Sequence, residues 1–164
     1  MFSAKEILAM AVKIEKNGEK IYREAVQEIN HPQLIELLEW MAEEEARHAE
    51  WFADMRLKWD PEHDNPLADE MSHQLFSEVI GDQGFSLNEV DFNAIRSTKQ
   101  LVRLFIEFEY DSILFYELIQ PFTKTDETKQ LLKRIILEEH RHIDKLKEII
   151  NTDTETVANS TELS

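Results

Sequence analysis

Apolar residues recur every three to four positions through four long segments of this chain. That spacing places them on one face of an α-helix, so each segment is predicted to be a helix with one buried side. Two of the starts carry capping boxes, Ser3-Ala4-Lys5-Glu6 and Ser97-Thr98-Lys99-Gln100. The four predicted helices run from Ser3 to about Asn30, from Pro32 to about Trp59, from Ser97 to about Pro121, and from about Asp126 to Ile150.

The connection between the second and third helices is much longer than the other two. It covers about 60–97, and its apolar spacing predicts a short amphipathic helix through Leu67, Met71, Leu75 and Val79. Two short turns and one long crossover are typical of an all-α four-helix bundle, to which we assign residues 1–150. Residues 151–164 contain almost no apolar side chains, so we predict a disordered polar tail there.

Polar residues interrupt the apolar stripes at matching places. In the second helix every seventh residue is apolar from Leu34 to Met55 except at His48, and from Leu38 to Trp59 except at Glu45. Residues seven apart lie on one side of a helix, so both polar residues are expected to face the core. The other three helices are interrupted in the same way. The interrupting residues are Glu15, Glu45, His48, Glu109, Glu139 and His142.

An internal repeat relates the two halves of the chain. Residues 3–54 align with the second half at a constant shift of 94 positions, and ten of 52 positions are identical. The identities include Glu15/Glu109, Tyr22/Tyr116, Glu44/Glu138, Glu45/Glu139, Arg47/Arg141 and His48/His142. In each half, the single glutamate and the Glu-x-x-His pair lie roughly 20 Å from the hairpin turn, at 1.5 Å per residue. We therefore expect the six interrupting side chains to meet near the middle of the bundle.

Four carboxylates in a core need a compensating charge. Without one, burial and mutual repulsion raise their pKa values until most are neutral. The stripes contain no lysine or arginine, and we expect Arg47 and Arg141 to face elsewhere, with Glu44 and Glu138 either solvated or paired with them. Two divalent cations supply the missing charge and leave the two histidines as neutral ligands. Such a dimetal site takes one glutamate from each of two helices and Glu-x-x-His from each of the others.

Composition narrows the range of partners. The formal net charge of −16 argues against binding to nucleic acid or to anionic membranes. No apolar run reaches the roughly 18–20 residues that span a bilayer, and the N-terminus lacks a signal-peptide pattern, so we expect a cytoplasmic location. Cysteine is absent, which excludes disulfides, thiolate zinc sites and iron–sulfur clusters.

The residues Glu15…Tyr22, Glu45-x-x-His48, Glu109…Tyr116 and Glu139-x-x-His142 resemble those of the ferritin-like diiron-carboxylate proteins, most closely the rubrerythrins. The resemblance covers about residues 3–150. It implies a ferritin-like bundle in which the six interrupting residues hold a diiron centre that reacts with hydrogen peroxide or oxygen. It also implies that Tyr22 and Tyr116 hydrogen-bond to ligand glutamates.

The chain departs from true rubrerythrins in two respects. Rubrerythrins carry a rubredoxin domain with four cysteines, so electrons here are expected from a separate donor protein or from Fe(II) itself. They also carry an extra glutamate three residues after the ligand of the third helix, where it exchanges with a histidine as the iron changes redox state. Ser112 takes that place here. The resemblance therefore does not extend to the redox-linked movement of iron or to the peroxidase turnover that depends on it.

The sequence is compatible with three functions. The first is oxidation of a reduced dimetal site by hydrogen peroxide or oxygen, with two iron ions preferred and manganese equally compatible with the ligands. Disproportionation of peroxide at a manganese pair is a variant of it. The second is iron handling, in which Fe(II) is oxidised and passed on without peroxidase turnover. The third is a metal-free helical interaction module. A homodimer or higher homo-oligomer is expected by analogy with proteins of this kind.

Overall fold

The computed structural model describes residues 2–58, 85–123 and 125–161, with the backbone alone for 152–161. Within these residues the chain forms the helices α1 (Ala4–Val26), α2 (Pro32–Lys58), α4 (Thr98–Ile119) and α5 (Asp126–Thr161). Three short 3₁₀ helices accompany them, η1 (Phe85–Leu87), η2 (Phe92–Ala94) and η3 (Gln120–Phe122). None of the helices in the described ranges is long and apolar enough to cross a bilayer.

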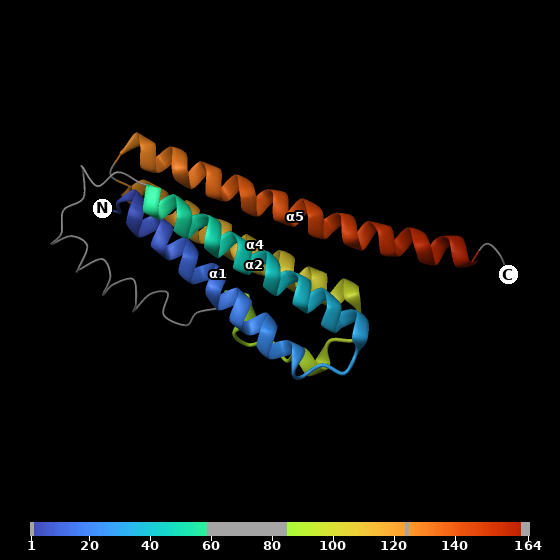
Figure 1. The fold of residues 1–164 in the computed structure, drawn as a ribbon. Coiled ribbons are helices and arrows are strands. Elements are labelled where there is room, and N and C mark those ends of the chain that lie inside the picture. Colours follow the sequence, from blue (N-terminus) through green and yellow to red (C-terminus); the bar gives the residue numbers. More distant parts are fainter. Residues whose placement is uncertain (1, 59–84, 124, 162–164) are drawn as a thin grey trace.

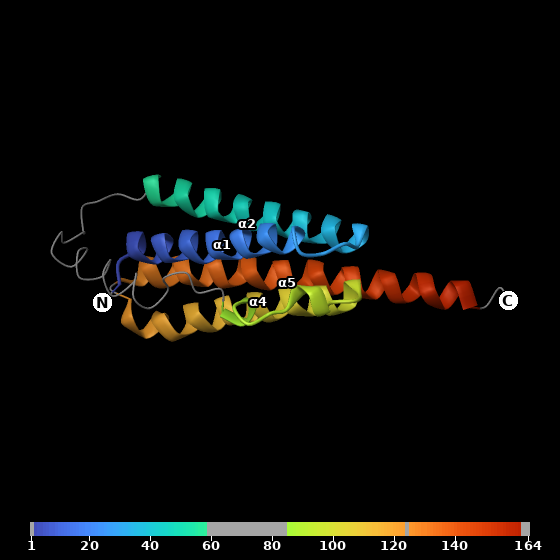
Figure 2. The same ribbon diagram turned by 90° about the horizontal axis from the view of Figure 1, so that it is seen from below.

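The four long helices pack as two hairpins. α1 and α2 form one, α4 and α5 form the other, and the hairpins lie side by side (Figures 1 and 2). This arrangement confirms the predicted all-α four-helix bundle. α4 runs antiparallel to α1, because Tyr22 meets Phe105 whereas Gly18, earlier in α1, meets Phe108. The helix predicted through Leu67 and Val79 lies outside the described residues.

The described end of the crossover is fixed to the bundle. η1 packs on α4, where the backbone N–H of Ser86 donates to Asp111 Oδ2 at 2.9 Å. The Phe85 ring is tilted against two rings of α4. Its centroid lies 6.2 Å from that of Phe108 and 6.0 Å from that of Phe115. The chain then follows α1 towards the first hairpin turn before α4 begins. The part of the crossover from Phe85 onward therefore covers the α1–α4 side of the bundle.

Both predicted caps are present, with one difference. At Ser3 the capping box is complete, because Glu6 N–H donates to Ser3 Oγ at 3.3 Å and Ser3 N–H donates to Glu6 Oε2 at 2.6 Å. At Ser97 the side chain accepts from Gln100 N–H at 3.2 Å, but Gln100 Oε1 accepts from Arg96 N–H instead of Ser97 N–H. The second box is thus only half formed, because the neighbouring N–H takes the reciprocal bond.

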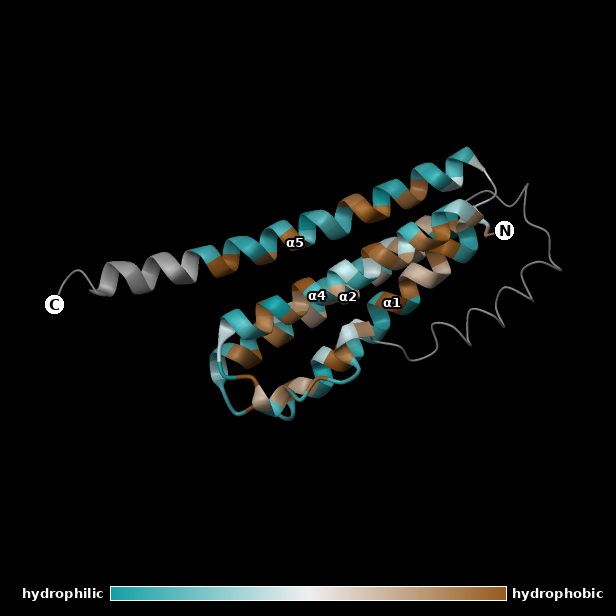
Figure 3. Ribbon diagram, turned by 180° about the vertical axis from the view of Figure 1, so that it is seen from behind, coloured by the Kyte–Doolittle hydropathy of each residue, from teal (hydrophilic) through white to brown (hydrophobic). Residues whose placement is uncertain are grey.

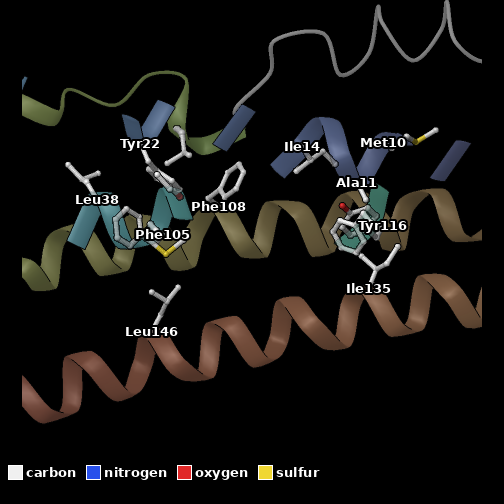
Figure 4. Close-up of a cluster of buried hydrophobic side chains, with 14 of the residues drawn as sticks. Met10, Ala11, Ile14, Tyr22, Leu38, Phe105, Phe108, Tyr116, Ile135 and Leu146 are labelled. Carbon is white, nitrogen blue, oxygen red and sulfur yellow. The ribbon is translucent and has the colours of Figure 1, made fainter. Parts of the chain in front are cut away.

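The apolar stripes form the core that surrounds the polar layer. Apolar and polar residues alternate along each helix in Figure 3, and the stripe positions Leu8, Leu38, Val102, Leu132 and Leu146 are fully buried. Tyr22 packs edge-on against Phe105 with 4.8 Å between ring centroids. Figure 4 shows Tyr22 at one level of the bundle and Tyr116 at another, each among apolar side chains.

α5 differs from the sequence prediction at its C-terminal end. We predicted a disordered tail from residue 151, whereas α5 continues to Thr161 and extends past the other helices (Figure 2). Residues 151–161 contain neither glycine nor proline, so nothing in the sequence stops the helix. Extending an existing helix costs far less than starting one, because each added residue gains a hydrogen bond.

Candidate metal centre

The six predicted ligands meet in the middle of the bundle. Glu15 comes from α1, Glu45 and His48 from α2, Glu109 from α4, and Glu139 and His142 from α5. Five of the six are at most 2% exposed, and the exception is His48, whose side chain is 19% exposed. Each residue lies in an apolar stripe of its own helix, which is what carries its side chain to the bundle axis.

The ligand atoms fall into two groups that each combine both halves of the chain. Glu15, His48 and Glu139 offer three atoms that all lie within 4.8 Å of one another. Glu45, Glu109 and His142 do the same. In each group the single glutamate and the histidine belong to one half, while the Glu-x-x-His glutamate comes from the other. These exchanged glutamates, Glu45 and Glu139, therefore link the two halves of the chain.

Close contacts connect the side chains within and between the groups. His142 Nδ1 lies 2.6 Å from Glu109 Oε1, and His48 Nδ1 lies 3.5 Å from Glu15 Oε2. The centroids of the two imidazole rings are 4.7 Å apart. The two groups are therefore adjacent, and one carboxylate can reach both.

Burial and crowding shift the pKa values of these groups strongly. Burial, together with the charge of Glu15, raises the pKa of Glu109 to about 8, while the proximity of the Glu139 carboxyl group opposes the rise. The pKa values of Glu45 and Glu139 are raised well above the ordinary value, first by burial and then by the charges of Glu15 and Glu109. Burial, followed by the positive charge of His48, lowers the pKa of His142 to about 3. Without added positive charge, this cluster holds protons that carboxylates normally lose.

The cluster has donor atoms that the protein does not satisfy. Several of its buried oxygens and nitrogens have no hydrogen-bond partner. They are Glu15 Oε2, Glu45 Oε1, Glu109 Oε1, both carboxylate oxygens of Glu139, His48 Nδ1 and both nitrogens of His142. Over the described residues no lysine or arginine is buried, so neither type of side chain neutralises the carboxylates inside the core. Two divalent cations fit this donor set, because they pair the carboxylates and bind the unpartnered imidazole nitrogens.

Tyr22 and Tyr116 lie beside the centre but do not make the predicted bonds. Both side chains are fully buried, and neither hydroxyl has a hydrogen-bond partner. The predicted hydrogen bonds to ligand glutamates are therefore absent from this structure. Burial, followed by the nearby glutamate charges, raises both pKa values well above the ordinary value. Each tyrosine follows its helix's glutamate by seven residues and the two helices are antiparallel, so the tyrosines flank the carboxylate layer from opposite ends. Figure 4 shows Tyr22 and Tyr116 well apart along the bundle.

Glu44 makes a contact that sequence reasoning missed. Its predicted pairing with Arg47 is confirmed, and at 5% exposed Glu44 is buried rather than solvated. Glu44 Oε2 also lies 3.5 Å from Nε2 of His142, a predicted ligand in the other half. Glu44 lies seven residues from both Leu37 and Trp51, and it is identical with Glu138 in the repeat. These were the available signals of its burial, although spacing within one helix does not identify His142 as its neighbour.

Ser112 is buried and does not replace the missing carboxylate. Its Oγ donates to the Phe108 carbonyl oxygen of the same helix at 3.1 Å. The hydroxyl is therefore satisfied by its own backbone, and this position supplies no exchanging ligand.

Comparison with known proteins agrees with the fold and the centre. The rubrerythrin family model matches residues 6–150. The crystal structure of a candidate ferritin-like diiron-carboxylate protein from Thermotoga maritima is 25% identical, with a TM-score of 0.50 over 90% of this chain and 94% of that chain. A hypothetical protein from Pyrococcus furiosus is 22% identical, with a TM-score of 0.47 over 90% and 87%. No curated protein matches the chain.

The family match spans the whole bundle and includes all six residues of the centre. The two groups of carboxylate and imidazole donors support a dimetal carboxylate centre. This chain belongs to the rubrerythrin family.

Proposed function

We propose that this protein binds two iron ions at the mid-bundle centre and that the reduced pair is oxidised by hydrogen peroxide or oxygen. The observation that carries the proposal is the pair of adjacent Glu₂His groups, buried and without protein partners for most of their donor atoms. Mixed carboxylate and imidazole ligands suit iron, and manganese fits the same set.

Each residue of the centre has a distinct part in holding the metals. Glu15 and His48 are assigned to one metal, and Glu109 and His142 to the other. Glu45 and Glu139 would complete the two groups, each as the carboxylate that the opposite half of the chain supplies. When bound, an iron pair supplies two electrons and a Lewis-acidic surface for the oxidant.

The surrounding side chains control water and protons. The described centre is enclosed by buried residues except at His48, so this histidine marks its most accessible side. Reduction of peroxide to two water molecules consumes two electrons and two protons. Tyr22 and Tyr116 remain protonated because their pKa values are raised, so their hydroxyls can donate hydrogen bonds towards an oxidant. Repeated turnover requires a separate electron donor.

A second candidate is oxidation of Fe(II) for storage or buffering without peroxidase turnover. Ser112 favours it, because this buried position carries no carboxylate to follow a metal as its charge changes. In that case iron leaves the centre after oxidation, and the protein processes more than two iron ions per chain.

Anaerobic loading with two equivalents of Fe(II) per chain, followed by rapid mixing with peroxide or oxygen, separates these functions. The near-ultraviolet absorbance of ferric iron reports each rate. Much faster reaction with peroxide supports the peroxidase. Faster reaction with oxygen that continues beyond two irons supports iron handling. No absorbance change with either oxidant overturns both.

A further inference from the structure

The internal repeat is broken structurally at one pair of matched residues. Glu44 and Glu138 each precede a Glu-x-x-His glutamate, and each pairs with the arginine three residues later. Their burial differs, because the Glu44 side chain is 7% exposed and that of Glu138 is 30% exposed. The same sequence motif therefore places its first glutamate in two different environments in the two halves.

Glu44 lies between the metal centre and the surface. Its Oε1 pairs with Arg47, and its Oε2 lies 3.5 Å from His142 Nε2 and 3.9 Å from Lys145 Nζ. The two cationic side chains are 62% and 60% exposed, so they cover Glu44 from the solvent side. The buried carboxylate thus has cations outside it and an imidazole inside it.

Two roles are compatible with this position. Glu44, His48 and His142 offer atoms within 4.8 Å of one another, which allows a third metal. However, a third metal would lie beside Arg47 and Lys145, which already balance the Glu44 charge, and the repulsion would oppose it. The alternative is that Glu44 accepts a hydrogen bond from His142 Nε2–H. The geometry favours this role, because Nε2 is buried, has no hydrogen-bond partner in the described structure and lies 3.5 Å from Glu44 Oε2, within reach of a hydrogen bond.

The orientation of His142 agrees with that role. Its Nδ1 lies 2.6 Å from Oε1 of Glu109, which belongs to the same ligand group, so Nδ1 is the nitrogen that faces the metal. Nε2 points the other way, towards Glu44. A carboxylate that binds the outer N–H of a ligating histidine fixes its tautomer and ring orientation. Glu44 from the first half is placed to do this for a ligand from the second half.

His48 has a different environment. Its ion-pair contact in the described structure is with Glu15, a member of its own ligand group. Its side chain is 19% exposed, compared with 1% for His142. His48 is thus the more accessible of the two ligating imidazoles, and Glu138 does not match the contact that Glu44 makes with His142.

We propose that Glu44 is a positioning residue that makes the two metal positions unequal. The position formed by Glu45, Glu109 and His142 binds the first metal and retains it, while the position formed by Glu15, His48 and Glu139 exchanges metal with solvent. This inference rests on the proposed dimetal function. It goes beyond that function by stating which metal position fills first and which one exchanges metal with solvent.

The test is an anaerobic equilibrium titration of the full chain with Fe(II) against a competing chelator. Wild type is compared with Glu44→Gln and with the matched control Glu138→Gln. We expect two unequal affinities in wild type. Glu44→Gln weakens the tighter one by about 10–100-fold, the usual effect of losing such a partner, and leaves the weaker one unchanged. Glu138→Gln changes neither affinity.

A double-mutant cycle with His142→Ala shows whether Glu44 acts through this histidine. If it does, Glu44→Gln has no further effect on metal affinity in the His142→Ala background. An undiminished effect there, equal weakening of both metals in the single variant, or loss of a third equivalent overturns the inference. Two metals bound equally in wild type also overturn it while leaving the dimetal function intact. A wild type that binds no metal overturns the proposed function itself.

Discussion

His142 Nδ1 of α5 lies 2.6 Å from Glu109 Oε1 of α4, and both side chains are almost fully buried. The contact joins two helices at the level where the other hairpin contributes Glu45. An uncompensated carboxylate in a core costs several kcal/mol or takes up a proton. The buried contact between His142 and Glu109 therefore indicates a centre that binds positive charge.

Replacing Glu139 by alanine tests the linking role of the exchanged glutamates. Both of its oxygens are buried without hydrogen-bond partners, and its donor atoms belong to the group of Glu15 and His48. We expect Glu139→Ala to reduce the bound metal from two equivalents to one or none. Equilibrium dialysis with metal analysis measures the ratio. Glu138→Ala, one residue away and more exposed, serves as the control and is expected to keep two equivalents.

The metal-free protein is expected to lose stability as the pH rises from about 6.5 to 8. The pKa of Glu109 is about 8 in the fold and 4.5 ordinarily, so its stabilising contribution is present below pH 4.5 and is lost as the pH rises through 8. Glu45 and Glu139 act in the same direction. His142 acts oppositely, because its lowered pKa makes a contribution that is lost as the pH falls from 6.5 towards 3.

Urea unfolding at several pH values in the presence of a chelator measures this slope. Metal loading is expected to remove it, because bound cations stabilise the ionised carboxylates. For the same reason metal affinity is expected to rise with pH over this range, as binding displaces the protons held by Glu109 and its neighbours. Metal-free stability that rises between pH 6.5 and 8 would contradict the assigned burial of the carboxyl groups.

Gly18 allows α1 and α4 to approach closely beside the centre. A Cβ at this position would lie 2.9 Å from Phe108 Cε1 and 3.4 Å from Glu45 Oε2. Gly→Ala in a helix interior normally stabilises by up to about 1 kcal/mol. Here the added methyl group overpacks the core, so we expect Gly18→Ala to destabilise the protein by about 1–3 kcal/mol.

Thermal unfolding of Gly18→Ala, alone and combined with Phe108→Leu, tests this explanation. The smaller leucine side chain removes the ring atoms that the new methyl group would meet. We expect the second substitution to cost less in the Gly18→Ala background than in wild type. Additive effects of the two substitutions would show that the contact does not limit this position.

Tyr22→Phe and Tyr116→Phe separate stability from reaction at the centre. Each hydroxyl is buried without a partner in the described structure, and such a group costs about 1–3 kcal/mol. Its removal is expected to leave the metal-free protein equally or more stable in urea unfolding. The iron-loaded variants are expected to react more slowly with peroxide in stopped-flow measurements. Destabilisation by more than about 1 kcal/mol would indicate a hydrogen bond to the hydroxyl that this structure lacks.

The fold and the ligand set follow from patterns that a sequence displays directly. The seven-residue spacing of Leu38, Glu45 and Phe52 predicts a buried carboxylate, and all three are buried. The repeat then supplies the partner residues and their depth along the bundle. Pro32 and Pro121 mark the ends of helices closely, because proline restricts the backbone wherever it occurs.

Three features could not be obtained in this way. Glu44 lies seven residues from Leu37 and Trp51, but its contact with His142 of α5 depends on how the two helices meet, which the spacing within α2 does not specify. The missing bonds of Tyr22 and Tyr116 depend on hydroxyl positions a few ångströms apart, whereas a stripe specifies only a side of the helix. The extension of α5 to Thr161 reflects continued backbone hydrogen bonding, which low apolar content does not prevent.

A crystal structure of the iron-loaded protein, with anomalous scattering recorded at the iron edge, tests the central claim most directly. We expect two iron peaks per chain about 3.5–4 Å apart, a usual spacing for two-metal sites. One is expected among Glu15, His48 and Glu139, and the other among Glu45, Glu109 and His142. Absence of iron from the mid-bundle cluster, or iron bound only at surface carboxylates, would contradict the account.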